Sequence, residues 1–481
     1  MIANVRVIDG SGSPARSASV RVDGNRITAV GKLETEPADE LIDGAGLVLA
    51  PGFIDAHSHH DTGIADSPQA LAAVSQGITT AVVGQDGFHA WPLQQFFDAL
   101  RQQPAALNFA SMAGHSTLRS RVMEDDYRRP SSDAEIGAML AMLAEELEAG
   151  ALGLSSGLEY DPGSFADTRE LLALAKIAAG ESGVYQTHIR SEDQYFWEAV
   201  DEAVHIGRGA QVPVIISHIK LAMNSYWGQA QRLLEVLDSA RDSGVDISAD
   251  IYPYDAWNTS FLWLETLFPE RDLNRREGAA YILNEMLSPE GILIFGHPAL
   301  PRDGMTIADM AALREQDHET VLIELLKQDA ATVREKGEEA GASMLGVAMH
   351  EQDIEPLMAW RHTVICSDGG LSGPHPRGFG AFARVLGYYS RQREVMPLET
   401  AVHKMTALTA SKLGIRSRGL IRPGFYADLV LFDPDLVADR ATAVEPLKVS
   451  AGIEQVWVNG KVVYENGAVT GALPGVPVLR Q

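Results

Sequence analysis

The chain has 481 residues, of which 46% are hydrophobic and 22% are charged, and its formal net charge is −26. This composition is typical of a globular protein with a large core and argues against a disordered chain. The acidic excess also argues against nucleic-acid and anionic-membrane partners, because such partners require clustered Lys and Arg.

Both ends of the sequence have the pattern of short strands. Residues 4–50 alternate apolar and polar side chains around Asp-Gly turns, and the same pattern returns at 428–432 and 456–464. An Asn-Gly pair at 459–460 predicts a tight hairpin turn in the last of these segments. Two β-rich ends therefore flank a middle of different character.

From residue 51 to about 413, short apolar runs alternate with longer amphipathic segments, such as the predicted helices 134–149 and 226–243. This alternation is typical of repeated βα units around a parallel sheet. Eight such units close a TIM-type (β/α)8 barrel, which makes an α/β fold our expectation. The eight predicted strands are 53–59, 79–84, 108–114, 151–156, 184–190, 212–218, 246–252 and 363–368.

More than one hundred residues separate the seventh and eighth predicted strands. That distance is far greater than the few residues usual for a loop in such a fold. The segment also contains a strand-like run at 292–295. We therefore predict an inserted subdomain or lid at about 258–346.

Four histidines and one aspartate lie at the carboxyl ends of predicted strands. His57 and His59 end the first strand, and period-two alternation places both imidazoles on one face. His188 ends the fifth strand, His218 the sixth, and Asp368 the eighth. Because these strand ends share one rim of a barrel, we expect a metal centre there, with Asp368 positioned to take a proton from an attacking water.

This arrangement resembles the amidohydrolase superfamily, which has His-x-His on the first strand, single histidines on the fifth and sixth, and an aspartate on the eighth. The segments 51–55 and 419–428 extend the resemblance to nearly the whole chain. It implies a β-sandwich domain built from 1–50 and 414–481, and a hydrolase barrel at 51–413.

Within that superfamily, the sequence looks most like the N-acyl-D-amino-acid deacylase (D-aminoacylase) family. This resemblance implies metal-dependent hydrolysis of N-acyl-D-amino acids to a carboxylate and a free D-amino acid, with one or two ions, zinc first among the divalent metals. The motifs that carry it are 157–163, 187–192, 217–220, 250–254 and 375–377.

The family's substrate site can be carried over residue by residue. The resemblance implies that Lys220, Tyr254, Ser260 and Arg377 hold the substrate carboxylate, and a guanidinium is suited to bind a carboxylate through two hydrogen bonds. Tyr160 would donate to the scissile carbonyl as negative charge develops there. The expected partner is therefore a small molecule with a free carboxylate.

The chain departs from the family at one metal position. These deacylases commonly carry a cysteine thiolate after the second strand, whereas this chain has Asp86 in the segment 84–87. A carboxylate can bridge two metals but favours harder ions than a thiolate does, and the change could also leave a one-metal centre. No lysine follows 151–156, which disfavours the cyclic-amide branch with its carboxylated lysine.

Two alternatives remain open at this stage. One is another amidohydrolase reaction, on a dipeptide, a cyclic amide or an N-acyl-L-amino acid, and the other is a catalytically silent barrel. His115 is the reserve metal ligand. The single cysteine, Cys366, is expected to be a buried thiol, and the absence of an apolar leader or membrane span predicts a cytoplasmic protein.

Overall fold

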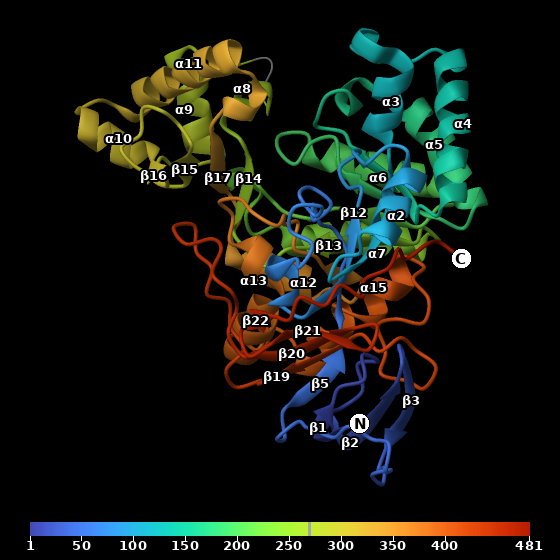
Figure 1. Cartoon of the computed structure of the whole chain (residues 1–481). Helices are drawn as coiled ribbons and strands as arrows, with labels where there is room; N and C mark the ends of the chain where they lie inside the picture. The colour runs from blue at the N-terminus through green and yellow to red at the C-terminus, as the bar shows by residue number, and fades with distance from the viewer. Residues whose placement is uncertain (268–270) are drawn as a thin grey trace.

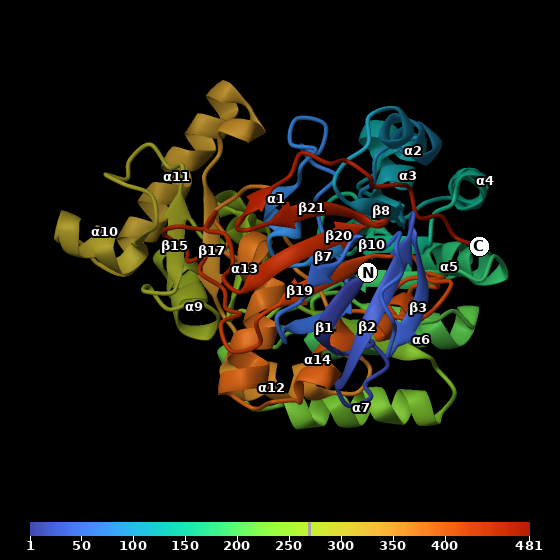
Figure 2. The ribbon, with the colours of Figure 1, turned by 60° about the horizontal axis from the view of Figure 1, so that its bottom comes forward.

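The computed structural model describes residues 1–267 and 271–481, and both ends of the chain contribute to one mixed sheet of nine strands. In Figure 2 the blue N-terminal strands lie beside the red C-terminal ones. The two sets join where β5 pairs antiparallel with β19, with Val48 opposite Phe432. The strands are β1 (Ile2–Val7), β2 (Arg16–Asp23), β3 (Arg26–Gly31), β4 (Ile42–Asp43), β5 (Val48–Pro51), β19 (Leu429–Phe432), β20 (Ile453–Val458), β21 (Lys461–Glu465) and β22 (Ala468–Val469).

The predicted hairpin turn joins β20 to β21. Asn459 and Gly460 have φ angles of 49° and 77°, so both lie in the left-handed region that a two-residue hairpin turn requires. A side chain at position 460 would also meet the carbonyl oxygen of Gly24 at 2.1 Å, which explains why glycine stands there. This prediction is confirmed.

Parallel strands overlap all eight segments predicted from the middle of the sequence. They form a three-stranded sheet, β6-β7-β8, and a six-stranded sheet, β18-β13-β12-β11-β10-β9. The third predicted strand is divided into two short pieces. The strands are β6 (Phe53–Asp55), β7 (Ile78–Val83), β8 (Asn108–Ser111), β9 (Ala113–Gly114), β10 (Gly153–Gly157), β11 (Val184–His188), β12 (Val214–Ile216), β13 (Ile247–Ile251) and β18 (Thr363–Ile365).

Backbone hydrogen bonds connect the edges of these two sheets. At one edge, the N–H of Leu152 donates to the carbonyl of Ser111 at 2.9 Å. At the other, the N–H of Asp368 donates to the carbonyl of His57 at 2.9 Å, and the N–H of His59 donates to Gly369 at 2.8 Å. The carboxyl ends of β6 and β18 are therefore held together, and His57, His59 and Asp368 follow these two ends.

Helices follow the strands, as βα units require. The predicted helix 134–149 is observed as α4, where Ser132 and Glu135 form a capping box. The predicted helix 226–243 is shorter, as α7, because 224–226 form a separate single turn. The helices are α1 (Leu71–Val74), α2 (Leu93–Gln102), α3 (His115–Met123), α4 (Asp133–Ala149), α5 (Thr168–Gly180), α6 (Phe196–Ala210), α7 (Ala230–Asp242), α12 (Glu351–Ala359), α13 (Arg377–Arg384), α14 (Leu398–Lys404) and α15 (Ala407–Lys412).

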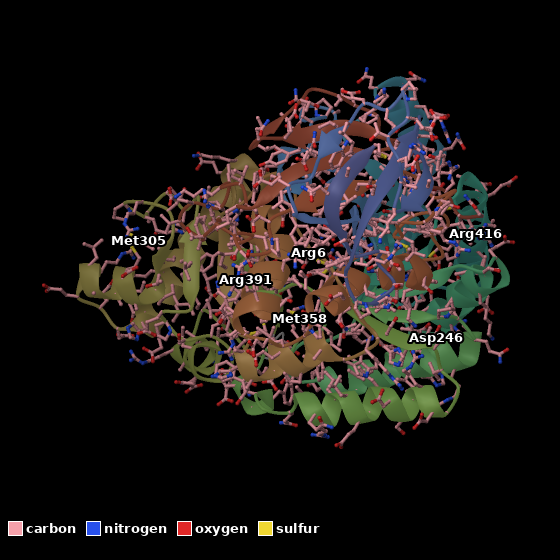
Figure 3. All side chains as sticks on the ribbon, turned by 90° about the horizontal axis from the view of Figure 1, so that it is seen from below. Arg6, Asp246, Met305, Met358, Arg391 and Arg416 are labelled. Carbon is pink, nitrogen blue, oxygen red and sulfur yellow. The ribbon has the colours of Figure 1, made fainter. Side chains whose placement is uncertain are left out.

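A separate four-stranded antiparallel sheet lies between β13 and β18 in sequence, in the order β14-β17-β15-β16. This segment lies at the upper left of Figure 1, and in Figure 3 its Met305 lies on the opposite side of the view from Asp246 and Arg416. Its elements are β14 (Ala256–Ser260), α8 (Leu264–Leu267), α9 (Arg276–Glu285), β15 (Ile292–Phe295), β16 (Met305–Thr306), α10 (Ile307–Arg314), α11 (His318–Lys336) and β17 (Ser343–Val347).

Burial follows the apolar pattern of the sequence. One large apolar cluster extends through the parallel strands and their helices, and a smaller one lies within the nine-stranded sheet. Cys366 is fully buried, as predicted. None of the helices in the described part of the chain is long and apolar enough to cross a membrane.

Candidate metal centre and substrate cavity

The predicted metal ligands converge in two groups that share one residue. His57, His59, Asp86 and Asp368 offer nitrogen and oxygen atoms that all lie within 4.8 Å of one another. Asp86 also forms such a group with His188 and His218. Asp86 therefore lies between two sets of ligands.

His57 and His59 reach this point from a loop, not from a strand. β6 ends at Asp55, four residues before the end of the predicted strand. Beyond it, the N–H of Ser58 donates to the carbonyl of Val82 on β7 at 3.0 Å, while that of His59 donates to Gly369 after β18. These bonds to opposite neighbours hold the two imidazoles with ring centroids 5.5 Å apart.

Three of the converging residues have a strained backbone. Asp86, His218 and Asp368 have φ angles of 53°, 34° and 48°. Few residues other than glycine adopt these values, and such strain is concentrated at functional sites. The surrounding hydrogen bonds must therefore hold these side chains in place at a cost in local stability.

The electrostatic field of the cluster favours a positive charge. Burial is the largest single effect and lowers the pKa of His57, but Asp86 and Asp250 together outweigh burial and raise that pKa well above its usual value. His59 responds similarly, since burial lowers its pKa but Asp368 and Asp86 together outweigh burial and raise that pKa to about 9. Protons or metal cations can supply the charge that the carboxylates attract.

The donor atoms fit a metal. Both ring nitrogens of His57 and Oδ1 of Asp86 are buried without a hydrogen-bond partner among the described residues. The Nδ1 atom of His188 faces Nε2 of His218 across 3.1 Å. Imidazole and carboxylate groups with unused lone pairs are the donors that zinc prefers in proteins.

Asp250 supports the cluster from behind, and its role was missed in the sequence. Its Oδ1 accepts the N–H of His218 at 2.7 Å and lies 3.9 Å from Nδ1 of His57, while Oδ2 accepts from Gln186 at 2.8 Å. The signal was a fully buried aspartate inside the apolar strand β13. Such carboxylates orient the histidines of metal sites.

Two glutamates flank the histidines on the substrate side, and the sequence suggested no role for them. Glu159 lies 3.0 Å from Nε2 of His188, and Glu192 lies 2.9 Å from Nδ1 of His218. Glu192 also accepts from Lys220 at 2.5 Å. The Lys220 ammonium is thus already paired where a substrate was expected to meet it.

A cavity of about 280 Å³ opens over the cluster. Tyr160, Lys220 and Arg377 line it, as does Tyr252, which the sequence analysis did not assign. Arg377 lies over the Tyr252 ring at 4.7 Å, and the buried Tyr252 hydroxyl has no hydrogen-bond partner among the described residues. Two cations and two phenols therefore face one small space.

His375 holds Arg377 at this cavity. Its ring Nδ1 accepts the backbone N–H of Arg377 at 3.0 Å, and its Nε2 lies 2.9 Å from the carbonyl of Ala256 on β14. These partners require a proton on Nε2, which makes His375 a neutral link between α13 and the insertion. Burial lowers its pKa to about 3, in agreement with a neutral ring.

Tyr254 and Ser260 do not line this cavity. The Tyr254 hydroxyl donates to Asp439 at 3.5 Å and its ring packs under Arg384, because the chain turns away after β13. Ser260 ends β14, is exposed and lines a neighbouring cavity. The structure thus places neither of these two predicted residues on the wall of this cavity, which Tyr252 lines.

The reserve ligand His115 lies in another network. Its Nε2 is 2.7 Å from Glu170, which also pairs with Arg119, and all three side chains are buried between α3 and α5. His115 belongs to none of the ligand groups found among the described residues.

The comparison with known families agrees with this geometry. A model described as "Amidohydrolase family" matches residues 40–464. The chain belongs to this family. The superfamily inferred from the histidine pattern is confirmed.

Curated relatives cover almost the whole of this amidohydrolase. A D-aminoacylase from Alcaligenes xylosoxydans xylosoxydans is 36% identical over 99% of the chain and 96% of its own length. An N-acyl-D-glutamate deacylase from the same organism is 37% identical over 95% of the chain and 92% of its own length. These relatives also confirm the predicted resemblance to the deacylase family.

A solved relative binds metal. The crystal structure of an N-acyl-D-glutamate deacylase from Bordetella bronchiseptica, complexed with zinc and a phosphonate inhibitor, is 36% identical to this amidohydrolase. The TM-score is 0.86, and the match covers all of the chain and 99% of the solved one. That inhibitor is described as a mimic of the tetrahedral intermediate of the reaction.

In this amidohydrolase, the two oxygens of Asp86 face different histidines. Oδ2 lies 3.4 Å from Nε2 of both His57 and His59, and Oδ1 lies 3.5 Å from Nε2 of His218. A bridging ligand needs donor atoms that face both metal positions. The carboxylate of Asp86 would meet that requirement without a thiolate if two metals were bound.

Proposed function

We propose that this protein is a metal-dependent hydrolase that cleaves the amide bond of N-acyl-D-amino acids, releasing a carboxylate and a D-amino acid. One observation carries the proposal: the His and Asp cluster and Arg377 face the same cavity. Hydrolysis of such a substrate needs an activating centre and a carboxylate anchor a few ångströms apart. The relatives that span the whole chain act on substrates of this class, according to their names.

We infer that His57, His59, His188, His218 and Asp86 hold one or two metal ions, with zinc as the preferred metal. When bound, such a metal supplies Lewis-acid activation of the scissile carbonyl and of the attacking water. The neutral phenol of Tyr160 lines the cavity beside His188, with ring centroids 4.6 Å apart, and donates a hydrogen bond to the carbonyl oxygen as charge develops. Burial raises the pKa of Tyr160, which keeps the proton available.

Asp368 moves the proton. Burial alone would raise its pKa, but the Arg377 charge and the His59 hydrogen bond hold that pKa far below its usual value, so the group is a carboxylate at neutral pH. Its Oδ1 lies 3.2 Å from His59 and faces the ligand cluster. From this position it accepts a proton from the attacking water and returns it to the leaving amine.

Arg377 and Lys220 attract the substrate carboxylate, and Tyr252 offers a hydroxyl beside them. With the substrate carboxylate held there and its carbonyl held near Tyr160, only one enantiomer directs the side chain of the amino acid into free space. This placement is the physical basis for selecting one enantiomer. The choice of the D form rests on the relatives.

We also infer the full architecture expected from the sequence. The three-stranded and six-stranded parallel sheets, with hydrogen bonds at both pairs of edges, support one closed (β/α)8 barrel at 51–413 with an insertion at about 258–346. The apolar cluster inside the nine-stranded sheet supports a β-sandwich domain formed by 1–50 and 414–481. The catalytic groups then lie at the carboxyl ends of the barrel strands.

Metal content and amine release test this function together. Purified protein is assayed with N-acetyl-D-methionine and N-acetyl-L-methionine, with and without a chelator. Bound zinc with chelator-sensitive, D-selective release supports the proposal. Release from the L substrate alone, or no release by metal-loaded protein, would overturn it.

A further inference from the structure

A second cavity, of about 550 Å³, lies next to the first. The two share Glu159, Tyr160 and Trp263, and the rings of Tyr160 and Trp263 lie 6.0 Å apart where the cavities meet. Beyond them the wall is formed mainly by the insertion, which contains α11 (Figure 1). We call this space the outer cavity; its other lining residues are Asp161, Ser260, Leu262, Asp329, Val333, Gly341 and Ala342.

The order of the parallel strands indicates what reaches the outer cavity. Arg377 follows β18 and Tyr160 follows β10, and three strands, β11, β12 and β13, separate them on one side. On the other side, β6, β7 and the strands β8 and β9 separate them. Arg377 and Tyr160 therefore follow strands on opposite sides of the set of parallel strands. A substrate with its carboxylate at Arg377 and its carbonyl at Tyr160 therefore directs its acyl chain past Tyr160.

The size of the outer cavity suits a group much larger than acetyl. An apolar cavity of ~150 Å³ is enough to hold a benzene molecule. At about 550 Å³ the outer cavity has room for a chain of several methylenes or a phenyl group. An acetyl group, with one methyl carbon beyond the carbonyl, would end at the boundary.

The lining of the outer cavity selects the chemistry of the chain. Leu262, Val333 and Ala342 offer apolar surface, whereas the charged lining residues among those described are all acidic. Asp161 is exposed on this wall and lies 3.8 Å from Arg128, which is outside the lining, and Glu159 accepts the N–H of Glu192 at 2.6 Å. None of the described lining residues is a cation, so an anionic acyl group would meet mainly like charges on this wall, while a neutral apolar group would be buried favourably.

We propose that the outer cavity is the acyl-chain site, and that the enzyme prefers N-acyl-D-amino acids with a neutral, apolar acyl group longer than acetyl. This inference rests on the proposed function. It assigns the insertion to acyl recognition, and it gives Ser260 a place on the acyl wall instead of at the substrate carboxylate.

Matched substrates test the preference directly. The wild-type protein is assayed with N-acetyl-, N-hexanoyl- and N-adipoyl-D-methionine; the last two have acyl chains of equal length that differ by a terminal carboxylate. We expect kcat/KM for the hexanoyl substrate to exceed both others by tenfold or more. Equal values for acetyl and hexanoyl, or a preference for adipoyl, would overturn the acyl-chain site.

Variants that fill the outer cavity with a larger side chain test whether it is the acyl-chain site. Val333→Phe adds bulk to a half-buried residue of α11 that lines the outer cavity, and Ala331→Phe adds the same side chain at an exposed position two residues earlier. We expect Val333→Phe to reduce the hexanoyl-to-acetyl ratio of kcat/KM at least tenfold and Ala331→Phe to leave it unchanged.

Ser260→Phe fills the outer cavity from an exposed position on another wall. We expect this variant to reduce the ratio as Val333→Phe does, so it serves as the test if Val333→Phe fails to fold. An unchanged ratio in the folded filling variants contradicts the inference.

Binding separates failure of this inference from failure of the proposed function. Calorimetric titration of the Asp368→Asn protein with the acetyl and hexanoyl compounds does not depend on turnover. If no N-acyl-D-amino acid is hydrolysed, the proposed function fails, but hexanoyl binding at least tenfold tighter than acetyl, lost on adding Val333→Phe, would still establish the acyl-chain site. Equal binding of the two compounds would reject it.

Discussion

Nη1 of Arg377 forms an ion pair with Oδ2 of Asp368 across 2.7 Å, and both side chains are more than nine-tenths buried. The other oxygen of Asp368 lies 3.2 Å from Nε2 of His59. One carboxylate therefore connects the group expected to hold the substrate with the cluster expected to hold the metal. Substitution of Asp368 should therefore affect mainly turnover, and substitution of Arg377 mainly substrate affinity.

Asp368→Asn should abolish most turnover while substrate and metal still bind. The amide keeps the shape of the side chain but cannot accept a proton from water, and a positioned general base contributes about 10²- to 10⁴-fold. Steady-state kinetics and metal analysis on the same sample provide the measurement. A kcat near that of the wild type would remove Asp368 from the proton-transfer role.

Arg377→Ala should act mainly on substrate affinity. The guanidinium is the donor best suited to bind a carboxylate, and its loss also leaves Asp368 without its cation. We expect KM to rise by at least tenfold, with partial recovery in Arg377→Lys, which restores charge without the planar fork. If KM for the N-acyl-D-amino acid is unchanged in Arg377→Ala, the carboxylate is held elsewhere.

Asp86→Ala should lower metal occupancy. Loss of a residue that only supports a ligand costs about 10- to 100-fold in metal affinity, so loss of a ligand that faces three histidines should cost at least as much. Metal content after dialysis, measured by mass spectrometry, gives the answer. Unchanged content would exclude Asp86 from the metal centre.

Asp86→Cys tests the chain's departure from its relatives. A thiolate is a softer ligand than a carboxylate, so this variant should favour Zn²⁺ over Mn²⁺ more strongly than the wild type does. Both proteins are dialysed against equal concentrations of the two ions, and the bound ratio is compared. A ratio that does not move toward zinc would mean that position 86 does not set metal preference.

The strand pattern and the ligand positions were predictable because both depend on local periodicity. Apolar runs of four to seven residues mark buried parallel strands, and a histidine after such a run must lie near the carboxyl end of the sheet. His188, the last residue of β11, is an example. The end of β6 was less predictable, since the bonds of Ser58 and His59 to different neighbours depend on strands distant in sequence.

The residues that line the two cavities were harder to predict, because many of them lie in loops. Tyr252 and Tyr254 are two residues apart, but β13 ends at Ile251, so alternation no longer decides which phenol faces the cavity. The outer cavity joins residues 159–161 with residues from 260–263 and 329–342, segments that no local pattern connects. Pairing of Glu192 with Lys220 likewise becomes visible only when the strands are placed side by side.

Stability should depend on pH through Lys404, at the end of α14. This side chain is 1% exposed, and its ammonium donates to the carbonyls of Trp360 and Thr363, the latter at 2.9 Å. Burial lowers its pKa from 10.5 to about 7. Between those values the unfolded chain binds a proton at Lys404 that the folded chain does not, so this residue makes the protein more stable as the pH rises from 7 toward 10.5.

Lys404→Met isolates that contribution, because every other titrating group is common to both proteins. The free energy of unfolding of the wild type, relative to that of the variant, should rise by on the order of 1 kcal/mol per pH unit between pH 7 and 9, and should be nearly constant below pH 6. Calorimetric melting temperatures across this range give the comparison. Lys176→Met, at an exposed position of α5, is the control and should show no such trend. A difference that stays flat from pH 7 to 9 would mean that Lys404 keeps its proton in the folded protein, with the two backbone carbonyls offsetting the cost of its burial.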